Sequence, residues 1–219
     1  MLRIFLHITF FLFFIGQVEA SMIIRGSGGG SACLGNEDVG FEEIGAPAKW
    51  TGTADFDYSA DPLECTESMQ IAPAEAAVWG PNWASTVRYW TMWITLDDGI
   101  EAIESFINVQ DSAGATIGAV KLRGTEAFFV LAGTNSSDTS ETIIPNSTTK
   151  IKFMADTSAA ASIITLWVWN GSGWGTPITS TDGTNVNDID KLQFLNGADT
   201  ENIIVDYIKT STSDIMSPD

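Results

Sequence analysis

The chain has 219 residues, of which 44% are hydrophobic and 11% aromatic, and this composition excludes a disordered polar chain. Acidic residues outnumber basic ones 28 to 10, which gives a formal net charge of -18. A protein that follows a nucleic-acid backbone needs clustered lysine and arginine, so we expect no nucleic-acid partner. Binding to an anionic membrane surface is disfavoured for the same reason.

Residues 1–20 have the pattern of a secretory signal peptide. A basic start, Met1-Leu2-Arg3, precedes an apolar run from Ile4 to Ile15, and Val18-Glu19-Ala20 ends in a small-x-small cleavage pattern. The run is shorter than the ~20 apolar residues that span a bilayer. We therefore predict cleavage after Ala20 and a secreted, extracellular protein with no membrane insertion. An uncleaved membrane anchor is the alternative interpretation.

Removal of the signal peptide takes away His7, the single histidine of the chain. Without it, the mature protein forms neither a Ser-His-Asp triad nor a Cys-His pair, and zinc sites with histidine ligands are excluded. Cys33 and Cys65 remain, and in an oxidising compartment a disulfide between them is the default expectation. The alternative is that Cys33 lies in a mobile leader and both thiols stay free.

The composition changes after the signal peptide. Residues 21–36 contain Gly26-Ser27-Gly28-Gly29-Gly30-Ser31, which is typical of a flexible leader. No similar break follows, so a single domain is predicted over residues 37–210. Residues 211–219 are expected to form a short polar tail.

Inside the predicted domain, apolar residues alternate with polar ones or form short β-rich runs, and no helical period persists over three turns. Strands are predicted over residues 67–72, 86–96, 105–110, 116–122, 127–131, 150–155, 162–170, 191–195 and 202–209. Turn sequences such as Asp111-Ser112-Ala113-Gly114 and Asn170-Gly171-Ser172-Gly173 separate them. Many short strands with closely spaced turns predict an antiparallel β-sandwich.

Two of the predicted strands carry aromatic side chains on one face. Over residues 86–96, Tyr89 and Trp93 share a face, and the other face includes Met92, Ile94 and Leu96. Over residues 162–170, Trp167 and Trp169 lie opposite Ile164, Leu166 and Val168. A sandwich core needs only one face of each strand. We therefore predict the aliphatic faces inside and the four aromatic side chains outside.

Further tryptophans are candidates to extend this outer aromatic surface. Trp174 follows a glycine-rich turn, and Trp79 and Trp83 lie in a segment that contains glycine and proline. The alternative is that loops fold over the second face of the sheet and bury these aromatic residues, because central strands are often apolar on both faces.

Several segments resemble concanavalin A-like, laminin-G-like jelly-roll modules. Gly40-Phe41-Glu42, followed by Pro47, Trp50, Asp61-Pro62-Leu63 and Ser68-Met69-Gln70-Ile71, is similar to the start of many extracellular jelly-roll modules. Residues 202–208 resemble their closing strand. The resemblance covers roughly residues 40–210 and extends to jelly-roll carbohydrate-binding modules. It implies an all-β fold, an antiparallel two-sheet jelly-roll β-sandwich of the concanavalin A-like type.

The resemblance also implies a structural calcium ion. In these modules calcium often bridges a glutamate of the opening strand and an aspartate of the closing strand, and the matching residues here are Glu42 and Asp206. Calcium takes oxygen ligands, and a buried carboxylate is costly unless it is hydrogen-bonded or bound to a metal. The alternative is that Asp206 faces water at the edge of a sheet or caps a turn.

Flat aromatic rings on an outer face can stack on the apolar C–H faces of sugars. Together with the resemblance, this predicts a non-catalytic, lectin-like module that binds a glycan or cell-surface polysaccharide through Tyr89, Trp93, Trp167, Trp169 and Trp174. A structural or adhesive extracellular protein that binds other proteins is one alternative, and a divergent glycan-cleaving enzyme is another. No catalytic residue is assigned, because most nearby acid pairs lie in turn-like sequence.

Overall fold

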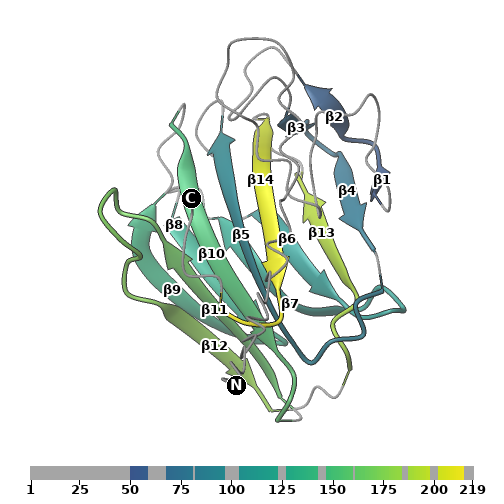
Figure 1. Cartoon of the computed structure of the whole chain (residues 1–219), viewed down its shortest axis with the longest axis vertical. Coiled ribbons are helices and arrows are strands. Elements are labelled where there is room, and N and C mark those ends of the chain that lie inside the picture. The colour runs from purple at the N-terminus through teal and green to yellow at the C-terminus, as the bar shows by residue number, and fades with distance from the viewer. Residues whose placement is uncertain are drawn as a thin grey trace, which may run out of the picture. The chain divides into compact units, whose positions relative to one another are not determined.

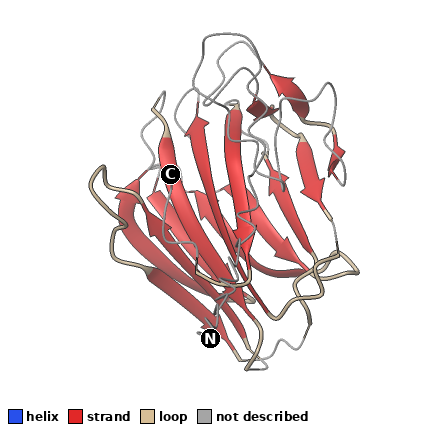
Figure 2. Ribbon diagram, in the orientation of Figure 1, coloured by secondary structure: helices blue, strands red, loops and turns tan. Residues whose placement is uncertain are grey.

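The computed structural model describes residues 50–58, 68–80, 82–96, 104–122, 127–142, 147–159, 161–183, 187–197 and 202–214. The predicted signal peptide and leader lie outside these residues, as do Cys33, Cys65 and Glu42, so the predictions made for them stay predictions. All regular structure in the described residues is β-strand (Figure 2). A helix long and apolar enough to cross a membrane does not occur among them.

The described strands form two antiparallel sheets (Figure 1). Their bounds are β1 Trp50–Gly52, β2 Asp55–Tyr58, β3 Ser68–Ile71, β4 Ala76–Trp79, β5 Val87–Leu96, β6 Glu104–Gln110, β7 Thr116–Leu122, β8 Ala127–Ala132, β9 Asn135–Thr142, β10 Thr149–Asp156, β11 Ser162–Val168, β12 Ile178–Asp182, β13 Lys191–Leu195 and β14 Ile203–Ser211. Sheet A has the order β1-β4-β13-β6-β7-β8-β9, and sheet B has the order β12-β11-β10-β5-β14-β3-β2. The predicted all-β, antiparallel two-sheet β-sandwich is confirmed, while the finer concanavalin A-like assignment stays a prediction.

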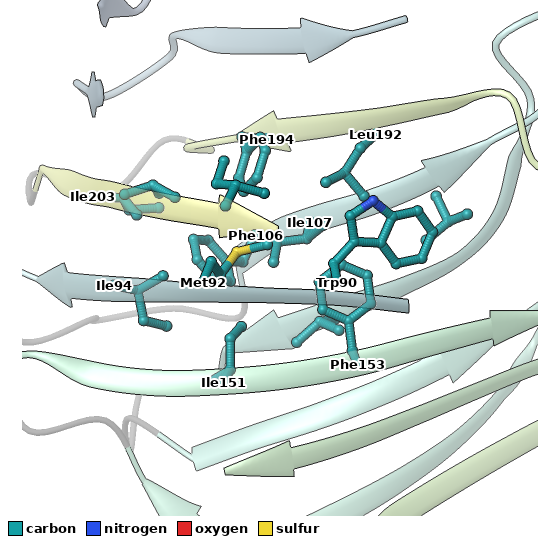
Figure 3. Close-up of a cluster of buried hydrophobic side chains, with 14 of the residues drawn as sticks. Trp90, Met92, Ile94, Phe106, Ile107, Ile151, Phe153, Leu192, Phe194 and Ile203 are labelled. Carbon is teal, nitrogen blue, oxygen red and sulfur yellow. The ribbon is translucent and has the colours of Figure 1, made fainter. Parts of the chain in front are cut away.

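The inner faces of the two sheets enclose one apolar core (Figure 3). Trp90 of β5 is fully buried and stacks on Phe153 of β10, with ring centroids 4.8 Å apart. From sheet A, Phe106 and Phe194 meet edge to face at 6.3 Å. The inner faces predicted for two strands are confirmed, because the following side chains are all buried: Met92, Ile94, Leu96, Ile164, Leu166 and Val168.

Trp79 belongs to this core and Trp83 packs against it, so the prediction that they extend the outer aromatic surface was wrong. Trp79 is 2% exposed and stacks on Trp50, with ring centroids 5.6 Å apart. Trp83 packs edge-on against Trp79 and Trp90. The physical reason is that Ala77 and Trp79 occupy the inward positions of β4, a strand of sheet A.

A β-bulge in β14 changes which residues face the core. Asp206 pairs with Trp93 of β5, but Lys209 pairs with Thr91, so β14 has one extra residue over this interval. Strict alternation would place Ile208 on the same face as Asp206. The extra residue turns Ile208 into the core, where it is fully buried, and leaves Asp206 on the outer face.

Gly118 in β7 lies where the two sheets approach closely, and we expect its replacement by alanine to destabilise the fold. A Cβ atom at this position would overlap the Ile164 side chain of sheet B and lie 2.8 Å from the Leu131 carbonyl oxygen. Overpacking of this kind costs about 1–3 kcal/mol of unfolding free energy. Urea denaturation of Gly118→Ala measures the loss.

Gly173→Ala is the matched control, because no atom lies within 4 Å of a Cβ built there. We expect this variant to keep nearly the stability of the natural chain. Equal stability of the two variants would contradict the close contact between the sheets at Gly118.

Candidate functional site

The outer face of sheet B brings together the five predicted aromatic binding residues. Tyr89 and Trp93 lie on β5 and Trp167 on β11, while Trp169 and Trp174 form an isolated bridge just after β11. All five side chains are half-buried, so they are neither fully open to solvent nor covered. The predicted outward direction of β5 and β11 side chains is therefore seen in the structure.

Strand pairing arranges these residues in rows across the sheet. Trp93 pairs with Lys150 of β10 and with Asp206 of β14. Lys152 pairs with Trp167. Two residues further along the chain, Trp169 lies beside Lys150, whose backbone carbonyl accepts a hydrogen bond from the Trp169 backbone N–H at 2.9 Å. Since neighbouring strands lie about 4.8 Å apart, Trp93 and Trp169 are separated by roughly 10 Å, with Lys150 between them.

Lysine side chains lie directly over the indole rings. Nζ of Lys150 is 4.4 Å from the ring centroid of Trp93. Nζ of Lys152 is 4.4 Å from the centroid of Trp167 and 5.5 Å from that of Trp174. A cation over an aromatic face contributes roughly 0.5–2 kcal/mol, increasing as the pair is desolvated. Each ammonium covers one face of its indole and helps to fix the orientation of the ring.

The predicted turn Asn170-Gly171-Ser172-Gly173 positions Trp174. The Asn170 side-chain oxygen accepts backbone N–H hydrogen bonds from Ser172 at 3.1 Å and Gly173 at 3.0 Å, and Gly171 has a φ of 91°. Glycine adopts this left-handed conformation without a steric penalty. Because the chain reverses here, Trp174 returns beside Trp169, with ring centroids 5.4 Å apart and planes at 81°.

The segment after β14 contributes a carboxylate to the same face. Lys152 donates a hydrogen bond to Asp214 Oδ1 at 2.9 Å, and the side chains of this ion pair are 3% and 42% exposed, respectively. Burial raises the pKa of the Tyr89 phenol, and the negative charges of Asp214 and Asp156 raise it further. Asp214 therefore lies close to both Lys152 and Tyr89 on the outer face of sheet B.

Asp206 lies beside Trp93 in the same row, on the neighbouring strand β14. Its side chain is 7% exposed and accepts a hydrogen bond from Ser68 Oγ at 3.0 Å, which offsets part of the cost of burying the carboxylate. Its predicted calcium-binding partner, Glu42, lies outside the described residues. Among the residues that the structure describes, no three histidine, cysteine, aspartate or glutamate side chains form a group that could hold a metal ion. The calcium site therefore stays a prediction.

Sequence analysis missed Lys150, Lys152 and Asp214. The alternation in β10 shows that the two lysines share a face, but only the strand order shows that this face adjoins Trp93 and Trp167. Asp214 belongs to the segment predicted as a polar tail, and no sequence pattern connects it to Lys152, 62 residues away.

A small polar pocket lies near the opposite end of β11 from Trp167. Its volume is about 220 Å³, and it is lined by Ala115, Thr116, Ile117, Gly133, Ser162, Asp182 and Asn187. Ligand pockets usually measure roughly 300–1,000 Å³. The aromatic outer face is therefore a better candidate site for an extended ligand than this pocket.

No protein-family model and no curated protein matches the chain. Its structure is similar to a sialidase, with a TM-score of 0.56 and 14% identity over 76% of this chain. It is also similar to a bifunctional GH43-CE protein of Bacteroides eggerthii, with a TM-score of 0.55 and 12% identity over 81% of this chain. The binding domain of botulinum neurotoxin DC, solved in complex with SialylT, matches with a TM-score of 0.51 and 10% identity over 76% of this chain.

This chain spans 17% of the sialidase, 27% of the GH43-CE protein and 43% of the neurotoxin domain. At such low sequence identity, the similarity shows the fold, an antiparallel β-sandwich.

Proposed function

We propose that the protein binds a glycan by stacking sugar rings on the outer face of sheet B. The observation that carries this proposal is the grouping of Trp93, Trp167, Trp169 and Trp174, all half-buried, in neighbouring rows of a single sheet face. Aromatic rings bury a large apolar area when a flat partner covers them. The apolar C–H face of a sugar ring is such a partner.

The position of these indoles favours a binding role over a purely structural one. The sandwich core is already filled by the inner faces, which include Trp90, Phe153 and Phe194. The outer indoles add little to that core and keep part of their apolar surface in water. Clustered apolar surface that stays exposed on a folded domain usually marks a site of interaction.

The structural relatives support a glycan as the ligand, because they include a sialidase and a neurotoxin binding domain in complex with SialylT. They include enzymes, so glycan cleavage is the second candidate function. We favour binding because the carboxylates that the structure describes near the aromatic surface each have a hydrogen-bond partner: Ser68 for Asp206, Lys152 for Asp214 and the Ser158 backbone N–H for Asp156. Hydrolysis of a glycosidic bond ordinarily needs two carboxyl groups that flank it.

The extracellular setting of this binding is part of the proposal and rests on the sequence of residues 1–20. The Cys33–Cys65 disulfide and the calcium site at Glu42 and Asp206 are likewise proposed from the sequence, as supports of the same exported domain.

Titration of the full chain with a panel of purified polysaccharides, followed by tryptophan fluorescence, tests the proposal. We expect at least one polysaccharide to quench or shift the emission in a saturable way, without any increase in reducing ends over the same period. Release of reducing ends would establish the glycan-cleaving alternative. Absence of binding to every glycan, together with self-association in size-exclusion chromatography, would favour the adhesive alternative.

A further inference from the structure

We infer that the glycan bound by sheet B carries carboxylate groups, as in uronic or sialic acids, and that Asp214 occupies the position of one such carboxylate at Lys152 in the free protein. The inference rests on the proposed function and names the chemical class of its ligand. It depends on three features of the outer face: its charge, the burial of Lys152 and the exposure of Asp214.

The outer face of sheet B gathers three lysines, matched by Asp156, Asp206 and Asp214, in a chain that is otherwise strongly acidic. The chain has a net charge of -18, yet Lys150, Lys152 and Lys209 all project from this face, because Lys209 and Lys152 both pair with Thr91. An acidic protein repels a polyanion except where basic side chains gather. Asp206 shares the face but is separated from Lys150 by the intervening strand that carries Trp93.

Lys152 is the best-placed cation for a carboxylate. Its side chain is 3% exposed and lies between the rings of Trp167 and Trp174, and its ammonium reaches Asp214 at 2.9 Å. Burying an ammonium is costly, and an apolar side chain at such a position often gives equal or greater stability. The charge is therefore better explained by recognition than by stability, since charge-assisted hydrogen bonds to carboxylates are strong and directional.

The neighbourhood of Lys152 has spare hydrogen-bonding capacity. Thr91 pairs with Lys152 across the strands, and its buried hydroxyl has no hydrogen-bond partner among the described residues. A buried polar group without a partner calls for an explanation. A hydroxyl of the incoming glycan supplies one.

Asp214 is suited to be displaced. Its side chain is 42% exposed, so water and ligands reach the outer side of the ion pair. A ligand carboxylate that enters between Trp167 and Trp174 takes the place of the Asp214 carboxylate on the same ammonium. The internal contact therefore lowers the apparent affinity for an anionic glycan by the fraction of molecules in which it is closed.

Binding assays with anionic and neutral polysaccharides test this inference. The probes are polygalacturonate, alginate and polysialic acid, with highly methyl-esterified polygalacturonate as the uncharged counterpart of the first. We expect the natural chain to prefer at least one carboxylate polymer. We expect Asp214→Asn to raise the affinity for that polymer by about threefold to tenfold, and Lys152→Met to lower it by about tenfold, with neutral binding nearly unchanged.

Matched variants control for overall charge and folding. Lys191→Met removes a lysine of sheet A, and Asp188→Asn removes an exposed carboxylate between β12 and β13, so neither should change the preference. Thermal melting of Lys152→Met checks its fold. If Lys152→Met is unstable, the surface change Asp214→Asn still tests the inference.

Equal binding of charged and methyl-esterified polygalacturonate, unaffected by Asp214→Asn, would overturn the inference and leave glycan binding standing. Failure of all glycans to bind either the natural chain or Asp214→Asn would overturn both proposals.

Discussion

Replacing Phe153 by alanine is expected to lower the unfolding free energy by about 3–5 kcal/mol. Phe153 is fully buried, stacks on Trp90 at 4.8 Å with ring planes at 19°, and lies on β10 between β5 and β11. The variant loses the transfer free energy of the ring and leaves a cavity that a central strand cannot easily close. Domains of this size are stable by only about 5–15 kcal/mol, so the loss is a large share of the total.

Urea denaturation of Phe153→Ala and of the milder Phe153→Leu measures this effect, with Met154→Ala as the matched control. Met154 is the next residue on β10 and is half-buried on the outer face, so its truncation should cost far less. Similar losses at the two positions would show that the inner and outer faces of β10 are wrongly assigned. Lys150 and Lys152 share the outer face with Met154, so such a result would also remove the basis of the binding site.

The strands that sequence analysis predicted are those with an apolar face directed into the core. The predicted strand over 86–96 corresponds to β5, and that over 116–122 to β7, with bounds that agree within one residue. These strands have a neighbour on each side, and their alternation or apolar runs reflect one face packed against the opposite sheet.

The strands that sequence analysis missed lie mainly at the sheet edges. β1 and β9 form the edges of sheet A, and β2 and β12 those of sheet B, while the missed β4 has only four residues. β9 reads NSSDTSET, which contains no aliphatic residue, and β12 reads ITSTD. Edge strands are commonly short and polar because this discourages pairing with other chains, so they lack the apolar pattern on which prediction depends.

The candidate site was predictable in its aromatic residues and not in its charges. The alternation in β5 and β11 fixes the face of Tyr89, Trp93 and Trp167, and each assignment needs only the strand itself. The contact of Lys152 with both Trp167 and Asp214 depends on the neighbouring strand and on a segment distant in sequence. Strand order and register are tertiary properties, which a single strand does not specify.

Replacing Trp167 by alanine is expected to weaken glycan binding by about 2 kcal/mol, or roughly thirtyfold. Trp167 offers stacking surface on β11, and its ring also forms one wall of the Lys152 position, 4.4 Å from the ammonium. The variant therefore loses stacking and orientation together. Isothermal titration with the glycan identified in the panel measures the change, and Trp167→Phe should recover part of the affinity because it restores a flat ring.

Ile163→Ala is the matched control for Trp167→Ala. Ile163 lies on the same strand and the same face, four residues away, and is half-buried like Trp167. Because it lies about 13 Å along the strand from the aromatic rows, its truncation should leave affinity unchanged. Both variants should keep a two-state thermal transition, since neither residue belongs to the core. Equal affinities of the two variants would mean that sugar rings do not stack on β11, and the binding surface would then have to lie elsewhere on the sandwich.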